Sequence, residues 1–381
     1  MIQTLRVFAL HIPSLTIGIS FFSLSLLMGT WVARIPDVQA RTGLSDGQLG
    51  ISMLGLSFGA LIGTALSGWL LSKLPTGRAS ALSAVFFGAA IVLPAFAFNQ
   101  VTLMAALMVV GATNGFMSVS VNAAAAAIEK HFRISIMSAC HGMFSLGGMI
   151  GAASSGWIAS MGIPLEWHFT TIALLMVLSQ IALRPILLNM PNNEVGGPRF
   201  VLPRKALLGL AIICFCIILC EGAVADWSAV YLKNNLQSSA FIAGLGYAGF
   251  CLTMALGRFS GDALRTRWGA NRTIRYGALI AAAGLVLLIA TTNPIAGVLC
   301  FVLIGAGLST IVPSIYGASA KVPGIPAGTG LASVATAGIM GMLTGRLLIG
   351  NISDAFGLNI ALALMAVLLL VAVGMANRVR V

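Results

Sequence analysis

The hydrophobic positions of this chain gather in long runs that short polar connections separate. A helix needs about 20 apolar residues to cross the hydrocarbon core of a bilayer, where it satisfies its own backbone hydrogen bonds. The pattern predicts twelve membrane-spanning helices. Their expected ranges are 10–33, 46–72, 79–98, 101–128, 136–160, 166–188, 206–232, 238–264, 273–292, 295–320, 327–350 and 358–377.

The longest polar stretch lies near the middle of the chain, between Asn189 and Lys205, and contains several proline and glycine residues. Such a composition is typical of a flexible connection. We therefore predict an N-terminal six-helix bundle at 1–188, a cytoplasmic linker at 189–205 and a C-terminal six-helix bundle at 206–381.

The two predicted bundles resemble each other in their glycine positions. Shifting the chain by 194 residues superimposes seven glycine pairs, from predicted spans 2 and 8, 4 and 10, and 5 and 11: Gly50 with Gly244, Gly55 with Gly249, Gly63 with Gly257, Gly111 with Gly305, Gly147 with Gly341, Gly151 with Gly345 and Gly156 with Gly350. A single offset through three span pairs predicts two parallel repeats.

Composition supports this picture. Of 381 residues, 59% are hydrophobic and 8% charged, against about 25% charged residues in soluble domains. The mean hydropathy is +1.01. These values exclude a soluble globular enzyme, a disordered chain and a nucleic-acid binder, and the fold class they predict is an all-α membrane protein.

The net charge of +12 comes from Lys and Arg residues spread singly over short connections. With the N-terminus in the cytoplasm, Arg34, Arg41, Lys233 and Arg346 lie outside, and the other 17 of the 21 basic residues lie inside. Cytoplasmic loops are enriched in basic residues. We therefore expect both termini in the cytoplasm.

Ionisable residues within spans are costly and mark functional sites. The seventh span contains Glu221 and Asp226, about 140° apart around the helix. We predict that Glu221 carries protons, because burial favours a neutral carboxyl; the alternative is a structural hydrogen bond. Asp226, Trp227 and Tyr231 are predicted ligand contacts, although Asp226 could reach the headgroups and the two aromatic residues could form an interfacial belt.

Polar side chains also mark the N-terminal bundle. Asn114, Ser118 and Asn122 follow one four-residue row of span 4, and His141 begins span 5. Amides in a membrane either join helices or line a wet cavity, and a lone histidine is often a satisfied core residue. Asn114, Asn122 and His141 are our further candidates for ligand contact.

Arg258, Asp262 and Arg267 lie at the cytoplasmic end of span 8. An acid flanked by arginines can form an ion pair in one conformation and release it in another, so this set is predicted to gate; the alternative is a solvated loop. We find no metal cluster, no nucleophile beside a base and no phosphate-binding loop, and we expect no metal and no cofactor.

The chain resembles the major facilitator superfamily in the loop pattern around Gly257, Asp262, Arg267 and Gly269. The counterpart after Gly68 has Ser72 in place of the acid. Further stretches resemble the fucose-permease-like branch that includes MosC-type bacterial inner-membrane permeases: residues 31–36, Val121–Ala123 through Glu129, 141–148 and 221–232. Relatives often carry an acid at the position of Ser118, so Glu221 is the better proton candidate here.

This resemblance implies a secondary transporter of the inner membrane, with alternating access, proton coupling and a small polar solute such as a sugar or polyol. A proton-driven exporter of drugs or metabolites, or a non-transporting sensor, are the alternatives. The expected partners are the solute, protons and the lipid bilayer, without nucleic acid, and the expected state is a monomer.

Overall fold

The computed structural model describes residues 8–192 and 202–376, and within these the side chains of all but residues 259–266. The described residues are helices and short connections, with no strand among them. The chain divides into two units. Unit 1 comprises Met1–Leu44 and Ser52–Pro198, and unit 2 comprises Ser45–Ile51 and Arg199–Val381.

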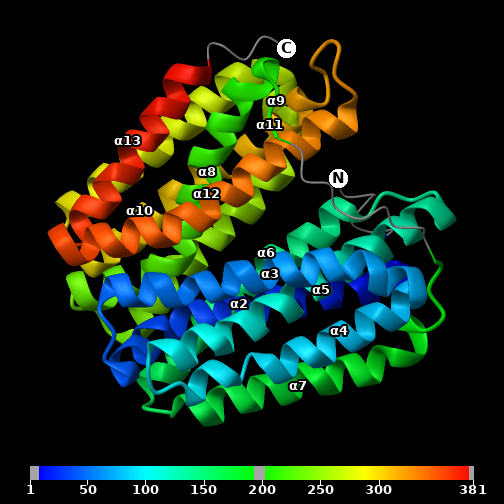
Figure 1. Cartoon of the computed structure of the whole chain (residues 1–381), viewed down its shortest axis with the longest axis horizontal. Coiled ribbons are helices and arrows are strands. Elements are labelled where there is room, and N and C mark those ends of the chain that lie inside the picture. The colour runs from blue at the N-terminus through cyan, green and yellow to red at the C-terminus, as the bar shows by residue number, and fades with distance from the viewer. Residues whose placement is uncertain (1–7, 193–201, 377–381) are drawn as a thin grey trace. The chain divides into compact units, whose positions relative to one another are not determined.

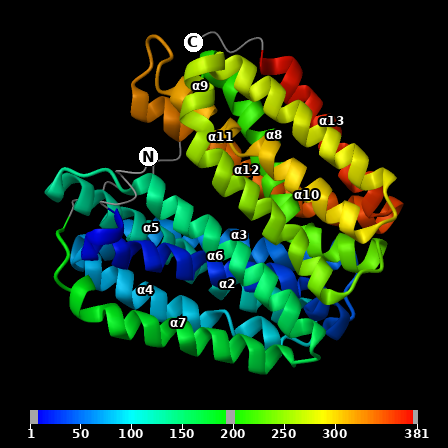
Figure 2. The same cartoon turned by 180° about the vertical axis from the view of Figure 1, so that it is seen from behind.

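Unit 1 is built from the helices coloured blue to green in Figure 1. Their bounds are α2 Ile12–Thr42, α3 Asp46–Lys73, α4 Thr76–Ala90, η1 Leu93–Phe96, α5 Gln100–Phe132, α6 Met137–Ser160 and α7 Leu165–Leu187. Within this unit α2 packs along α6, and α4 lies between α5 and α7 (Figure 2).

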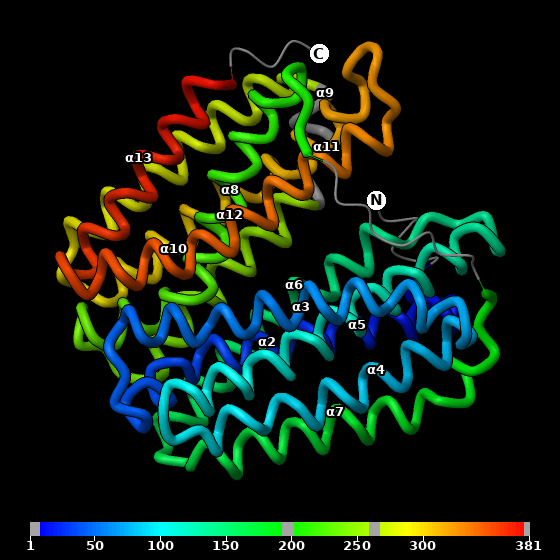
Figure 3. The backbone as a smooth tube through the Cα atoms, viewed as in Figure 1, coloured from blue at the N-terminus to red at the C-terminus, as the bar shows by residue number. Residues whose placement is uncertain are grey.

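Unit 2 follows in green to red, and its backbone path is clearest in Figure 3. Its elements are η2 Lys205–Leu207, α8 Leu208–Val230, the π-helical turn η3 Tyr231–Asn235, α9 Ala240–Ala290, α10 Pro294–Leu308, α11 Ile311–Ser319, α12 Ala327–Phe356 and α13 Leu358–Ala376. Here α8 packs along α12, and α9 packs along α10.

The predicted fold class is confirmed. Eleven helical segments are long and apolar enough to cross a membrane, by length and composition. The predicted fifth span, 136–160, corresponds to α6, a helix of 24 residues. Every predicted span therefore coincides with a helical segment.

Several helix ends differ from the prediction. Helix α2 continues to Thr42 with Pro36 inside it, and α5 continues to Phe132, because the polar residues that end an apolar run can stay helical outside the hydrocarbon. The predicted connection at 265–272 is helical except at Gly269, whose φ of 76° breaks the helix within α9. Predicted span 295–320 is divided between α10 and α11.

The repeat predicted from glycine positions recurs in the packing of each unit. A Cβ added at Gly147 would overlap the backbone oxygen of Phe22, and one at Gly341 would overlap that of Phe215. Similarly, a Cβ at Gly111 would overlap Leu56 O, and one at Gly305 would overlap Phe250 O. In each contact, the glycine and the carbonyl residue of unit 1 lie 193 or 194 positions before their counterparts in unit 2. Corresponding glycines thus bring corresponding helices together.

The first turns of α3 belong to unit 2, where they pack on the end of α12. The Ser45 hydroxyl donates to Asp354 Oδ2 over 2.7 Å, and the Ser353 hydroxyl donates to Asp46 Oδ2. Gly50 lies against the backbone of Gly350, where a Cβ would come within 3.3 Å of Gly350 Cα.

Candidate functional site

Glu221 lies in the middle of α8 and is partly buried. Its Oε1 is buried and has no hydrogen-bond partner among the described residues. Arg258 of α9 and Tyr316 of α11 lie within electrostatic reach of Glu221, and the Tyr316 hydroxyl forms a hydrogen bond with Cys214. A carboxyl placed in this way can hold or release a proton without breaking an ion pair.

Asp226 lies further along α8 and forms an ion pair with Arg346 of α12. Arg346 Nε donates to Asp226 Oδ2 over 2.8 Å, and Nη2 lies 3.4 Å from Oδ1. Both residues are buried, with 4% of Asp226 and 6% of Arg346 exposed. The sequence placed Arg346 among the outer charges and did not reveal its partner; the structure brings it onto α8.

Trp227 and Tyr231 lie in the packed core of unit 2, each 1% exposed. The Tyr231 hydroxyl lies 2.8 Å from Asn359 Oδ1 and 3.1 Å from Leu288 O, so its polar atom contacts α9 and α13. The Trp227 Nε1 is buried without a hydrogen-bond partner among the residues that the structure describes. Burial to this degree identifies both aromatic residues as part of the packed core of unit 2. Their contact with a ligand stays a prediction.

Asn114, Ser118 and Asn122 are all partly exposed along one row of α5, while Gly115 and Val121 beside them are buried. The Asn122 Nδ2 donates to Ser118 O over 2.9 Å. This row is therefore a polar strip on a largely apolar helix.

His141 lies in the first turns of α6 and is also partly exposed. Its ring packs edge-on against Phe21 of α2, with 5.4 Å between the ring centroids. The predicted ligand contacts of the N-terminal bundle thus lie on α5 and α6, within unit 1.

The predicted gating set is described only in part. Arg258 and Arg267 are exposed, and the side chain of Asp262 lies outside the described residues. The backbone is helical up to Gly269, so Arg267, which the prediction placed in the connection at 265–272, also lies on a helix. Their gating role stays a prediction.

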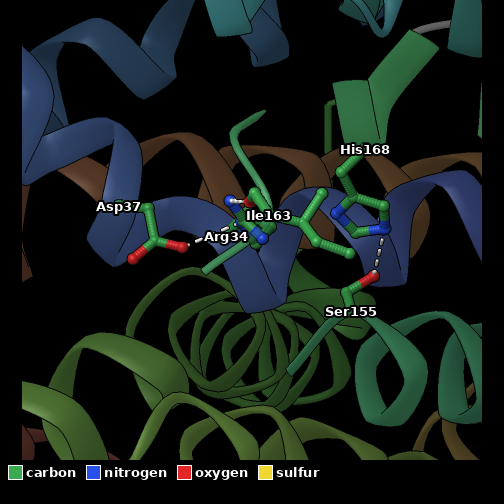
Figure 4. Close-up of polar contacts among 5 residues, drawn as sticks. All are labelled: Arg34, Asp37, Ser155, Ile163 and His168. Atoms are coloured by element: carbon green, nitrogen blue, oxygen red, sulfur yellow. Dashed lines mark hydrogen bonds and ion pairs between the residues drawn. The ribbon is translucent and has the colours of Figure 1, made fainter. Parts of the chain in front are cut away.

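A polar cluster of unit 1 was not among the predicted sites. Arg34 of α2 is 3% exposed. Its Nε lies 2.8 Å from Asp37 Oδ2, and its Nη2 donates to Ile163 O over 3.0 Å. His168 Nε2 lies 3.5 Å from Ser155 Oγ beside this group (Figure 4). About two helical turns beyond Arg34, Arg41 pairs with Glu166.

The signal for this cluster was a charged residue placed directly after an apolar run. The predicted end of the first span at residue 33 put Arg34 in a loop, whereas the helix continues and buries it. Arg34 and Arg41 tie the end of α2 to the α6–α7 connection and to the start of α7. Because their partners are protein groups, we assign them to packing.

Comparisons with known proteins agree with this architecture. The profile of the Major Facilitator Superfamily matches residues 14–324. An uncharacterized MFS-type transporter of Yersinia pestis is 32% identical over 362 residues, covering 95% of this chain and 94% of that protein. Membrane protein MosC of Rhizobium meliloti is 30% identical over 358 residues, covering 94% and 86%.

Two solved structures share the fold at low sequence identity. The nucleoside transporter NupG has a TM-score of 0.77 at 12% identity, covering 97% of this chain and 100% of that one. The E. coli fucose:proton symporter FucP has a TM-score of 0.62 at 17% identity, covering 97% and 98%. The expected resemblance to MosC-type and fucose-permease-like proteins is thereby confirmed.

Proposed function

The chain belongs to the major facilitator superfamily, and we propose that it couples the movement of a small polar solute, of the sugar or polyol class, to protons across the bacterial inner membrane. Glu221 is the proposed proton carrier, and Asn114, Asn122 and His141 are the proposed ligand contacts. The proposal rests mainly on Glu221, whose buried Oε1 has no hydrogen-bond partner among the described residues.

The cost of charge in a membrane explains why this observation points to proton exchange. A carboxylate without a partner is expensive inside a bilayer, and such residues commonly mark proton relays. Asp226, by contrast, already has Arg346 as its partner. FucP is a fucose:proton symporter and NupG a nucleoside transporter, and this likeness supports a hydroxylated polar solute.

The solute class is tested by thermal unfolding of the purified protein with sugars, polyols, nucleosides, carboxylates, amino acids and lipophilic cations. A ligand at about 100 times its Kd adds about 2.7 kcal/mol of stability. We expect stabilisation by a sugar, polyol or nucleoside. Stabilisation by lipophilic cations alone would favour the exporter alternative, and binding without flux in liposomes would favour a sensor.

The proton role is tested with Glu221→Gln, which keeps the shape of the side chain but cannot release a proton. In liposomes containing the stabilising solute, we expect exchange of solute across the membrane to continue and uptake driven by a pH gradient to fall to background. Glu166→Gln is the matched control, because Glu166 lies at the start of α7 beside Arg41. Gradient-driven uptake by Glu221→Gln at the wild-type rate would contradict the proposal.

A further inference from the structure

The two carboxyl groups of α8 have different surroundings, although only five positions separate them. The carboxylate of Asp226 accepts hydrogen bonds from two nitrogens of Arg346, whereas Glu221 Oε1 has no hydrogen-bond partner among the described residues. An opposite charge in contact favours the ionised carboxyl, and burial without one favours the neutral form. The same helix therefore presents two carboxyl groups with different chemistry.

Other titratable groups also face these carboxyls. The groups around Glu221 are Arg258 of α9, Tyr316 of α11, and Cys214 and Cys220 of α8 itself. Tyr247 of α9 lies within electrostatic reach of Asp226. Helix α13 also packs on α8 and carries no titratable side chain. Among the described groups that face Asp226, Arg346 is the one in direct ionic contact.

The internal repeat shows that the helix contact itself does not require charge. The α8–α12 contact of unit 2 corresponds to the α2–α6 contact of unit 1, as the glycine–carbonyl contacts of Gly341 and Gly147 show. By the same offsets, Asp226 corresponds to Ala33 and Arg346 to Ala152. Both alanines are buried, with 4% and 0% exposed. Two methyl groups in unit 1 thus occupy the positions of an ion pair in unit 2.

A buried ion pair is weak support for stability, because well-packed apolar residues commonly do as well or better. Its presence at a position that alanines fill in the other repeat therefore calls for a role other than closing the contact. The pair does give Asp226 an ionic partner in contact, whereas Glu221 Oε1 has no hydrogen-bond partner among the described residues.

We propose that Arg346 is a positioning residue that keeps Asp226 engaged in a buried ion pair, and so leaves Glu221 as the carboxyl of α8 that exchanges a proton. This inference rests on the proposed function, since it explains which acid of α8 serves in coupling. In this proposal Asp226 does not contact the solute. Arg346 takes part in transport through Asp226 and does not bind the solute itself.

The test uses dicyclohexylcarbodiimide, an apolar reagent that adds to protonated carboxyl groups in membrane proteins. The carboxyl proton moves to a carbodiimide nitrogen, the carboxylate oxygen bonds to the central carbon, and rearrangement leaves a stable acylurea. Purified full-length protein is treated with the reagent, and adducts on the α8 peptide are located by mass spectrometry. In the wild type we expect the adduct at Glu221 and none at Asp226.

Removal of the arginine should reverse the protection of Asp226. Breaking a buried pair leaves the remaining partner without its counter-charge, so in Arg346→Gln we expect Asp226 to become reactive and its labelling to rise about tenfold or more. Arg346→Lys, which retains the charge, should keep Asp226 largely unlabelled. A purely structural role would not change which carboxyl reacts.

Two controls keep the test decisive. If Arg346→Gln fails to fold, the double variant Asp226→Asn with Arg346→Gln should recover a monodisperse protein, because both members of the pair are then neutral. Equal labelling of Asp226 in wild type and in Arg346→Gln would overturn the role of Arg346. An unlabelled Glu221, with Asp226 still dependent on Arg346, would instead overturn Glu221 as proton carrier and leave the ion-pair assignment standing.

Discussion

Glycine residues set how closely the helices approach within each unit. At Gly147 and Gly341 the space that a Cβ needs is taken by a backbone oxygen, which cannot rotate away as a side chain can. Gly374 of α13 has no heavy atom within 4 Å of the same position. The chain therefore contains glycines that are needed for packing and glycines that are not.

We expect Gly147→Ala and Gly341→Ala each to reduce the free energy of unfolding by about 1–3 kcal/mol, the usual cost of overpacking. Gly374→Ala should be neutral or slightly stabilising, since alanine favours the helix by about 1 kcal/mol. Thermal unfolding in detergent measures all three variants. Equal melting temperatures for Gly147→Ala and Gly374→Ala would show that the backbone contact is not as close as described.

Glu129 illustrates an acid whose role is structural. Its Oε1 accepts hydrogen bonds from the backbone nitrogens of Ile136, over 2.6 Å, and Met137, over 2.8 Å. Free backbone N–H groups at a helix start favour a negative charge. Glu129 therefore joins the end of α5 to the start of α6. The sequence locates this acid just after the predicted span 101–128 but does not show its backbone partners.

At the scale of helices, the repeat extends to the residues that begin them. Asn99 precedes α5 and its side chain accepts from Thr102 N over 2.9 Å. Asn293 precedes α10 and accepts from Ile295 N over 2.9 Å. The two asparagines are 194 residues apart, so equivalent helices start with the same cap.

We expect Asn99→Ala and Asn293→Ala each to lower stability by about 1 kcal/mol, because a backbone N–H loses its acceptor. Asn99→Asp and Asn293→Asp keep an acceptor oxygen at the same position and should melt close to the wild type. Melting curves in detergent provide the comparison. A loss as large in the aspartate variants as in the alanine variants would mean that the cap is not the source of the stability.

Helices could be predicted from the sequence, whereas several of their ends and contacts could not. Apolar runs long enough to cross a bilayer have few alternatives to a helix, so all spans were found. Gly269 interrupts α9 at a single residue, and the stretch 265–272 looked like a loop because five of its eight residues are polar. Polarity near a membrane surface does not distinguish a loop from an exposed helix.

The candidate site could be predicted in the same uneven way. Glu221 stood out because a carboxyl in an apolar helix is costly. Arg346 could not be recognised as the partner of Asp226, because its position along α12 does not show which face of α8 it contacts. The burial of Trp227 and Tyr231 was also hidden, since aromatic residues suit both a core and a ligand wall.

At the scale of the whole molecule, the distribution of Lys and Arg predicts the orientation in the membrane. The connection after α6 should face outward and the connection after α11 should face the cytoplasm. Ser160 and Lys321 are exposed at these two places. The native cysteines are all buried, which keeps unwanted labelling low.

We expect a membrane-impermeant maleimide added to intact cells to label S160C and to leave K321C unlabelled until the membrane is permeabilised. The wild-type chain serves as the background control. Labelling of K321C in intact cells, with S160C protected, would establish the opposite orientation.

The contact between the start of α3 and the end of α12 has a consequence for biosynthesis. Asp46 and Ser353 are 307 positions apart in the chain. At the usual elongation rate of about 5–20 residues per second, the ribosome needs about 15–60 s to complete the stretch between them. During that time α3 can insert into the membrane before α12 is available to contact its first turns. Nascent chains halted before α12 emerges would therefore contain α3 without the hydrogen bonds that hold Ser45 and Asp46 in the finished protein.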